Sequence, residues 1–263
     1  MKPKALVLLA YGTNRDHDVA EALTLAGAEP EIVPLILLRD GKMRWSDYQM
    51  LVLPGGFSYA DALGAGKLLA IDMQAYFAEE IQKFVETGKP VIGICNGFQA
   101  LVKSGMLPGN SEKRIVNSPS AATLTFNAKG HFECRWVTLQ PVSQKCVWTK
   151  GLSELIECPI AHGEGNFQTM SHSLLTDLES LDQIALVYTQ PDGTPANGEY
   201  PVNPNGSVLD IAGITNPLGN VLGLMPHPEN HIHSWQHPQR TRGVERGSGL
   251  SLFKNGVKFV EEQ

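Results

Sequence analysis

The segment 89–103 constrains the fold of this chain more than any other stretch. Its apolar run Val91–Ile94 is typical of a buried parallel strand, and the apolar spacing of Phe98–Val102 is typical of a helix that follows at once. Cys95 stands at the junction between the two. A side chain at such a junction points out of the carboxyl end of a sheet, so the segment predicts a nucleophile elbow.

The residues around Cys95 favour a reactive thiol. Gly93 and Gly97 remove the Cβ atoms that would crowd a tight reversal of the chain. The N-terminus of the following helix offers free amide donors and the positive end of the helix dipole, which favour a thiolate over a thiol. A small, inert, buried cysteine is the alternative, and the elbow alone does not decide between the two.

Strand and helix patterns alternate around this segment. In the first half, strands are predicted at 5–10, 31–37 and 47–54, and helices at 16–26, capped by Asp16, and at 66–87. From 114 onwards short alternating runs predict antiparallel strands at 123–126 and 131–139. Further strands are predicted at 155–160, 184–189, 207–214 and 221–225. A surface loop is predicted at 191–206 and a closing helix at 250–260. The predicted fold class is therefore α/β. A mostly parallel central sheet is flanked by helices and carries a small antiparallel extension, in one domain spanning 1–263.

Charge and hydropathy exclude several classes of function. A formal charge of −6 and a pI near 5.7 argue against non-specific binding to nucleic acid. No segment reaches the roughly 18 apolar residues of a membrane span. The N-terminus enters a strand directly and shows no cleavage signal, which predicts a cytoplasmic location. The four cysteines form no Cys-x-x-Cys pair, so reduced thiols are expected.

Two further segments would meet the Cys95 elbow in such a fold. The segment 53–56 ends a strand with two glycines whose amides can approach a ligand closely, and the segment 225–229 follows another apolar strand. In the latter, His227 and Glu229 are two residues apart, so in extended backbone both side chains point the same way. A thiol nucleophile needs a base, and the base needs a partner that fixes its tautomer. Each segment alone could be an ordinary turn, but together with Cys95 they favour a catalytic triad.

Six motifs resemble those of class I, or triad, glutamine amidotransferases. They are Leu-Pro-Gly-Gly-Phe-Ser-Tyr from Leu53, Gly-Ile-Cys-Asn-Gly-Phe-Gln from Gly93, Ala-His-Gly-Glu-Gly-Asn-Phe from Ala161, Asn-Pro-Asn-Gly-Ser from Asn203, Asp-Ile-Ala-Gly-Ile from Asp210 and Met-Pro-His-Pro-Glu from Met225. They span nearly the whole chain, and within the class they are most similar to the glutaminase subunits of phosphoribosylformylglycinamidine synthases of purine biosynthesis. The resemblance implies a flavodoxin-like fold and an enzyme that hydrolyses L-glutamine to glutamate and ammonia.

The resemblance also implies roles for individual residues. Cys95 would be the nucleophile, His227 the general acid and base, and Glu229 the residue that orients His227. Binding of glutamine and of the oxyanion is implied for a second group of residues, namely Gly55, Gly56, Asn96, Gln99, Gly163 and Glu164.

Partners follow from the same resemblance. The chain has no Gly-x-x-x-x-Gly-Lys-[Ser/Thr] motif, because the nearest run, 64–68, lacks the hydroxyl that binds magnesium. No cofactor is expected on this chain. ATP and magnesium are expected on a large synthetase subunit, which would convert formylglycinamide ribonucleotide to formylglycinamidine ribonucleotide. A small accessory subunit is a further expected partner, and neither nucleic acid nor membrane is expected.

Two alternatives remain at this point. A cysteine hydrolase of related fold would also use an elbow cysteine and a histidine, and a non-catalytic scaffold subunit would keep the fold for assembly alone. The histidines at 231, 233 and 237 could suggest a metal site, but their spacing is not that of a helical zinc site and a solvated polar loop is favoured. Three tryptophans are predicted to be packing residues, namely Trp136, Trp148 and Trp235.

Overall fold

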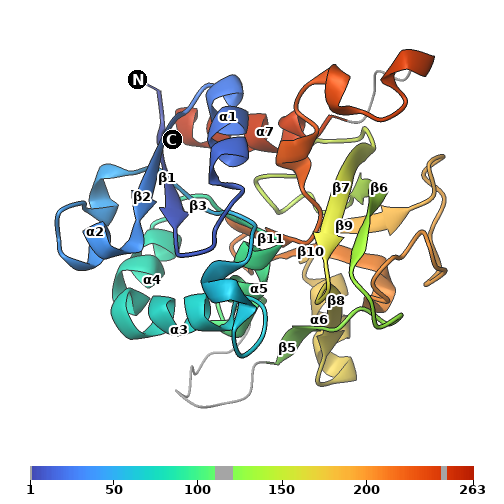
Figure 1. Cartoon of the computed structure of the whole chain (residues 1–263), viewed down its shortest axis with the longest axis horizontal. Coiled ribbons are helices and arrows are strands. Elements are labelled where there is room, and N and C mark those ends of the chain that lie inside the picture. The colour runs from blue at the N-terminus through green and yellow to red at the C-terminus, as the bar shows by residue number, and fades with distance from the viewer. Residues whose placement is uncertain (1, 110–120, 244–247) are drawn as a thin grey trace.

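The computed structural model describes residues 2–109, 121–243 and 248–263 (Figure 1). Within these ranges the main sheet has nine strands in the order β2-β1-β3-β4-β11-β10-β9-β6-β7, with helices on both faces. Its strands are β1 Lys4–Leu9, β2 Glu29–Pro34, β3 Met50–Leu53, β4 Val91–Ile94, β6 Glu133–Pro141, β7 Ile156–His162, β9 Ile184–Thr189, β10 Ile211–Thr215 and β11 Val221–Leu224. The α/β class predicted from the sequence is confirmed.

The direction of the strands divides the sheet into two parts. The first five strands in the sheet order, from β2 to β11, run parallel to one another. Beyond β11 each neighbouring pair is antiparallel, so that β10 and β6 alone oppose the common direction of the sheet. The antiparallel extension predicted from the sequence is thus present, and it continues the main sheet. A separate antiparallel pair joins β5, Ala122–Thr125, to β8, Asn166–Thr169.

The central strands are buried along their whole length. Every residue of β3, β4 and β11 is buried, as their continuous apolar sequences predict for parallel strands covered on both faces. Helix α5, Asn96–Lys103, packs on these strands at backbone distance. A Cβ atom at Gly97 would lie 2.0 Å from the carbonyl oxygen of Leu53, and one at Gly93 would lie 2.4 Å from Leu101 Cδ1. This contact fixes where α5 begins and hence where Cys95 lies.

The remaining helices form a layer on each face of the sheet (Figure 1). Helices α1 and α7 pack against each other on one face, and α3 to α5 lie on the other. The helices are α1 Asp16–Ala26, α2 Leu35–Arg39, α3 Lys67–Tyr76, α4 Ala78–Glu86, α5 Asn96–Lys103, α6 His172–Ser180 and α7 Leu250–Glu261. None of the described helices is long and apolar enough to cross a membrane.

Some predicted helices and caps differ from the structure. The helix predicted at 66–87 is two helices, α3 and α4, because Phe77 leaves helical geometry with φ −135° and ψ 14° and buries its ring at the break. The apolar pattern continues across this break, so periodicity alone does not reveal it. Asp16 is the first helical residue of α1 and not its cap, since Arg15 holds the cap position.

Some predicted strands also differ. The strand predicted at 31–37 ends at Pro34, and the apolar residues that follow it form the short helix α2, because a brief apolar run fits either structure. The strand predicted at 207–214 begins only at Ile211, after a short turn at Val208–Asp210. Strand β8 and helix α6 were not predicted. The residues 114–120 of the predicted antiparallel region lie outside the described residues.

Candidate active site

Cys95 lies between β4 and α5 in strained backbone. Its φ of 50° and ψ of −104° are values that residues other than glycine rarely adopt. The surrounding structure holds this conformation, since the Cys95 N–H donates to Leu224 O at 2.8 Å and the Cys95 carbonyl accepts from Gln99 N at 3.0 Å. The strand, sharp turn and helix predicted from the sequence are therefore present.

His227 and Glu229 follow β11 and are held together away from water. His227 Nδ1 lies 2.7 Å from Glu229 Oε1, and the side chains are 4% and 0% exposed. The His227 N–H donates to Pro159 O at 2.8 Å, which ties this segment to β7. With Nδ1 committed to the carboxylate, the ring has Nε2 for another partner.

Gly55 shows how closely the three segments meet. A Cβ atom at Gly55 would lie 2.7 Å from His227 Cε1 and 3.4 Å from Cys95 Cβ. The end of β3 therefore contacts both the elbow after β4 and the segment after β11. These are neighbouring parallel strands, and their carboxyl ends form the edge where α/β sheets bind ligands.

The charges in this group keep His227 protonated. Burial by itself lowers the pKa of an imidazole, but the Glu229 carboxylate, the electrostatic interaction with Cys95 and the hydrogen bonds to both outweigh it and raise the pKa of His227 to about 10. The imidazolium is thus the stable form at neutral pH. This arrangement places a cysteine side chain and a protonated imidazole side by side.

Two backbone amides are available at the same edge of the sheet. The N–H of Asn96 is in the first turn of α5, where amides have no intrahelical acceptor. Gly56 has φ 135° and pairs with the loop after β1, and a Cβ atom at this position would lie 2.7 Å from Asn14 N. Glycine is therefore required at 56 by both conformation and space.

The side chain of Asn96 holds a buried polar network. Its Nδ2 donates to Asp61 Oδ1 at 2.9 Å and to Gln99 Oε1 at 3.2 Å, while its Oδ1 accepts from the N–H and the hydroxyl of Ser58. Burial raises the pKa of Asp61, and the hydrogen bond from Asn96 partly opposes that effect. Sequence reasoning assigned no role to Ser58 or Asp61, although both lie just after the double glycine.

Gln99 connects α5 to the loop between β7 and β8. Its Nε2 donates to Glu164 O at 2.7 Å. The Glu164 carboxylate accepts from Ala65 N at 3.2 Å and lies 3.4 Å from Lys103 Nζ. The structure thus brings together Gln99, Gly163 and Glu164, the residues expected to bind the amino-acid end of glutamine. The Gln99 amide nitrogen already donates to a protein carbonyl. Gln99 is therefore placed to hold the loop between β7 and β8 in position.

His162 closes the site from the side of β7. Its Nδ1 lies 3.1 Å from Asn127 Oδ1. Burial, together with the nearby charge of His227, lowers the pKa of His162 to about 3, so the ring is neutral at physiological pH. Asn127 was not singled out from the sequence, where it stands in an ordinary turn sequence between two strands.

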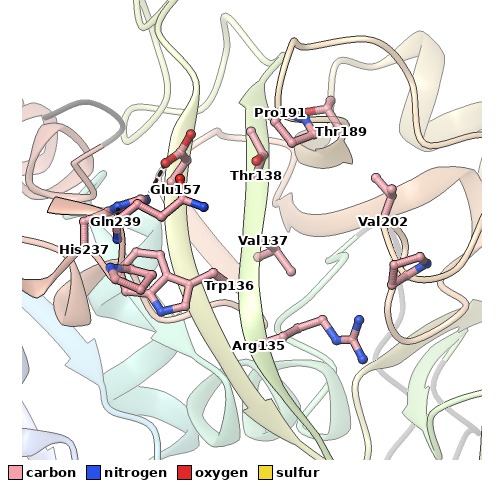
Figure 2. Close-up of a pocket in the computed structure, with 12 residues that line it drawn as sticks. Arg135, Trp136, Val137, Thr138, Glu157, Thr189, Pro191, Val202, His237 and Gln239 are labelled. Atoms are coloured by element: carbon pink, nitrogen blue, oxygen red, sulfur yellow. Dashed lines mark hydrogen bonds and ion pairs between the residues drawn. The ribbon is translucent and has the colours of Figure 1, made fainter. Parts of the chain in front are cut away.

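The segment after Glu229 packs on the sheet. His231 and His237 are 2% and 8% exposed, and their rings lie 5.1 and 4.9 Å from that of Trp136. His237 Nε2 is 2.8 Å from Glu157 Oε2, the pair joined by a dashed line in Figure 2. The prediction of a solvated loop is therefore wrong for these histidines. Positions 244–246 of this segment lie outside the described residues.

The described residues contain no group of three side chains suited to a metal ion. Trp148 is fully buried, as predicted, but Trp235 is 58% exposed and stacks on His233, so the packing prediction is wrong there. A cavity of about 350 Å³ lies beside Trp136 and His237, and its lining does not include Cys95 (Figure 2).

Comparison with known proteins matches residues 2–260 to the CobB/CobQ-like glutamine amidotransferase domain. The chain belongs to this glutamine amidotransferase family. It is 56% identical to the phosphoribosylformylglycinamidine synthase subunit PurQ of Treponema denticola, over 99% of this chain and 100% of that protein. It is 42% identical to the subunit of the same name from Dehalococcoides mccartyi, over 99% of both chains.

Solved structures agree with this assignment. A chain in the structure of PurLQS from Thermotoga maritima is 32% identical, with a TM-score of 0.73 over 98% of this chain and 99% of that one. A glutamine amidotransferase from the same organism, at 14% identity and a TM-score of 0.56, shares the fold. As an amidotransferase, the chain is expected to need a nucleophile, a base and an oxyanion site, and the carboxyl edge of its sheet holds residues suited to each.

Proposed function

We propose that this chain is the glutaminase subunit of phosphoribosylformylglycinamidine synthase. It hydrolyses L-glutamine to glutamate and ammonia for an ATP-dependent synthetase subunit, which converts formylglycinamide ribonucleotide to formylglycinamidine ribonucleotide. The contact of Gly55 with both His227 and Cys95, beside the His227–Glu229 pair, is the observation that carries the proposal. Full-length similarity to PurQ proteins supports the choice of pathway.

In the first half of the reaction, the Cys95 thiolate attacks the side-chain amide carbon of glutamine. Negative charge develops on the amide oxygen, and the N–H groups of Gly56 and Asn96 stabilise it. Losing one such donor typically costs about 3 to 4 kcal/mol of transition-state stabilisation. The His227 imidazolium then donates its proton to the departing nitrogen, so ammonia leaves and a thioester to Cys95 remains.

In the second half, neutral His227 takes a proton from water. The resulting hydroxide attacks the thioester, glutamate is released, and the proton on His227 restores the starting ion pair. Glu229 keeps the ring in the orientation that both transfers need, because its bond to Nδ1 leaves Nε2 to exchange the proton.

The assembly follows from what ammonia requires. Ammonium is not a nucleophile, so ammonia has to pass directly to the synthetase that consumes it. The large synthetase subunit, which holds ATP and magnesium, and a small accessory subunit are the partners of this chain. The relative in the PurLQS structure supports this arrangement. We further propose that residues 1–263 form one amidotransferase domain and that the protein is cytoplasmic, where thiols such as Cys95 stay reduced.

The test is the intact mass of the chain after incubation with diazo-oxonorleucine, an electrophile that mimics glutamine. We expect one adduct, on Cys95, that an excess of glutamine suppresses. Labelling is chosen because it does not require turnover in the absence of the synthetase. No adduct, even with the synthetase and its nucleotide present, would remove the glutaminase assignment and favour a scaffold role.

A matched pair of variants makes this test specific. Cys95→Ala should abolish the adduct. Cys134→Ala should leave it unchanged, because Cys134 is the exposed free cysteine on β6. An adduct that persists in Cys95→Ala would assign the labelling to another thiol.

A further inference from the structure

The loop 163–165 joins β7 to β8, and its backbone carbonyls are held from three directions. Gly163 O accepts from Asn127 N at 2.9 Å, Glu164 O from Gln99 Nε2 at 2.7 Å, and Gly165 O from Asn205 Nδ2 at 2.8 Å. The three donors come from segments far apart in the chain. The loop therefore has no freedom to rotate its peptide groups without breaking a buried hydrogen bond.

Asn127 holds one side of the loop with both the oxygen and the nitrogen of its side-chain amide. Its Oδ1 accepts from Gly165 N at 3.0 Å and lies 3.1 Å from His162 Nδ1. Its Nδ2 donates to the carbonyls of His162 at 2.8 Å and His131 at 3.0 Å. A single buried side chain thus bonds the residue before the loop and the residue that ends it.

The Asn-Pro-Asn-Gly-Ser motif at 203–207 holds the other side. Asn205 Nδ2 also donates to the buried hydroxyl of Tyr188 at 3.0 Å, and Ser207 Oγ donates to Gly165 O at 3.3 Å. Asn203 fixes the motif itself, because its Oδ1 accepts from Gly206 N at 2.9 Å and its Nδ2 donates to Ser207 O at 2.8 Å. Ala128 N donates to Asn205 O at 3.0 Å, so the two sides are also joined to each other.

Close packing completes this arrangement. A Cβ atom at Gly165 would lie 2.2 Å from His162 Cε1, and one at Gly206 would lie 2.6 Å from Ala128 Cβ. The His162 ring, fixed by Asn127, therefore lies directly on the α-carbon of Gly165. Small residues at these two positions let the two amides reach the loop.

The orientation of the peptide groups shows what the loop presents to the site. In a trans peptide the C=O and the next N–H point in opposite directions. Since Gly163 O points to Asn127, the N–H of Glu164 points away from Asn127, and Glu164 O points to Gln99 on α5. Among the hydrogen bonds of the described residues, none uses the Glu164 N–H. That amide is therefore available to a ligand.

We propose that Asn127 and Asn205 are positioning residues for glutamine recognition. Their side-chain amides, from opposite sides, set the peptide planes of 163–165 that receive the amino-acid end of the substrate. Neither residue touches the reacting atoms. The proposal rests on the glutaminase function given above, and it assigns a role to the 203–207 motif.

The test compares two electrophiles on Cys95 in isosteric variants. Asn127→Asp and Asn205→Asp keep side-chain size but replace the donors with oxygen. We expect the rate constant for labelling by diazo-oxonorleucine, which needs the amino-acid subsite, to fall by about tenfold or more. Labelling by iodoacetamide, which lacks an amino-acid end, should change less than about twofold. In the complex with the synthetase, KM for glutamine should rise by a similar factor while kcat changes little.

Asn220→Asp is the matched control. Asn220 is as buried as Asn127, and its Nδ2 also donates to two backbone carbonyls, Val85 O at 2.8 Å and Lys89 O at 2.9 Å. It precedes β11, at the opposite end of the sheet from the elbow. The control should lower thermal stability without changing KM for glutamine. Ser207→Ala is the milder variant if an aspartate prevents folding. It removes the 3.3 Å bond to Gly165 O and the 3.0 Å bond from Phe167 N, and the expected rise in KM is about threefold.

The outcomes separate the two proposals. Unchanged labelling by diazo-oxonorleucine in both aspartate variants would overturn the positioning role. So would an equal loss of labelling by both electrophiles, or the same loss in Asn220→Asp, because either would indicate a general effect on the fold. A wild-type chain that gives no glutamine-protected adduct would instead overturn the proposed function itself.

Discussion

His227 Nδ1 lies 2.7 Å from Glu229 Oε1, in a pair that is almost wholly excluded from water. Salt screens such a buried pair far less than a pair on the surface. Glu229 Oε2 has no hydrogen-bond partner within the described part of the chain, so the carboxylate directs its bonding to His227. Removing one member leaves the other buried without compensation.

Replacing Glu229 with glutamine should therefore affect turnover more than binding. We expect Glu229→Gln to lower kcat for glutamine by about 10²- to 10⁴-fold, because the imidazole loses both its orientation and the charge that raises the pKa of His227. KM should change little. Steady-state glutaminase assays of the complex check this. Glu21→Gln is the control, because Glu21 also pairs with a histidine but is exposed. Its Oε1 lies 2.8 Å from His233 Nε2. Equal activity in both variants would contradict the prediction.

Gly55 should not tolerate even one added methyl group. The Cβ of Gly55→Ala would lie 2.7 Å from His227 Cε1, so the ring has to leave its present position. A displacement of this size at the reacting groups is expected to lower kcat by about 100-fold or more. Gly41→Ala is the control for the substitution, because nothing lies within 4 Å of a Cβ there. Its φ of +67° should lower the free energy of unfolding by about 1 kcal/mol without affecting kcat. Near-normal turnover in Gly55→Ala would show that His227 does not need its present position.

Acid should destabilise the fold through His162. The pKa of His162 is lowered to about 3 in the folded chain, while an unfolded histidine titrates near 6.5. Between these values the unfolded chain binds one more proton, so the free energy of unfolding falls as the pH falls. The expected slope is about 1.4 kcal/mol per pH unit, or about 2 kcal/mol between pH 6.5 and 5. Urea denaturation of the wild type and His162→Gln at several pH values measures it. An identical pH dependence in the two proteins would contradict the assignment.

Gly256 in α7 should be an exception to the rule that alanine stabilises helices. A Cβ atom at 256 would lie 2.2 Å from Trp148 Cζ3, and Trp148 is fully buried. Gly256→Ala should therefore lower the free energy of unfolding by about 1–3 kcal/mol, although alanine is favoured over glycine in an open helix by about 1 kcal/mol. In a Trp148→Leu background the same substitution should cost less, because the clashing ring is absent. Urea denaturation of the four proteins gives the coupling between the two sites.

The sequence predicted the parts of the candidate active site that depend on local spacing. The elbow at Cys95 follows from an apolar run, two glycines and a helix within fifteen residues. The placement of His227 and Glu229 two residues apart predicted that the two side chains meet, and the 2.7 Å contact agrees with it. The predicted extended backbone is wrong, because Pro228–Asn230 forms a single 3-10 turn. Parallel-strand topology then brings Gly55, Cys95 and His227 to one edge. The elbow and the His227–Glu229 pairing are inferences from local spacing, whereas the meeting at one edge also needs the order of the strands in the sheet.

Predictions failed where distant contacts decide the outcome. Phe77 interrupts the helix predicted at 66–87 because its ring finds a buried site, and nothing in the local pattern shows that site. His231 and His237 are polar residues in a polar segment, yet they are buried because Trp136 and Glu157 on β6 and β7 offer them partners. Burial of a polar side chain is possible only where the fold supplies a hydrogen bond, and the sequence does not state where that is.

The sequence by itself thus determined the fold class, the elbow at Cys95 and the pairing of His227 with Glu229, because these depend on periodicity and on spacings of a few residues. The tertiary structure alone decided how the loop 163–165 is held. Asn127 and Asn205 stand 78 positions apart by their residue numbers, and each meets the loop only because the β5–β8 pair and the main sheet are packed together. Hydrogen bonds act over about 3 Å, so a role that consists of hydrogen bonds exists only once folding has brought their partners together.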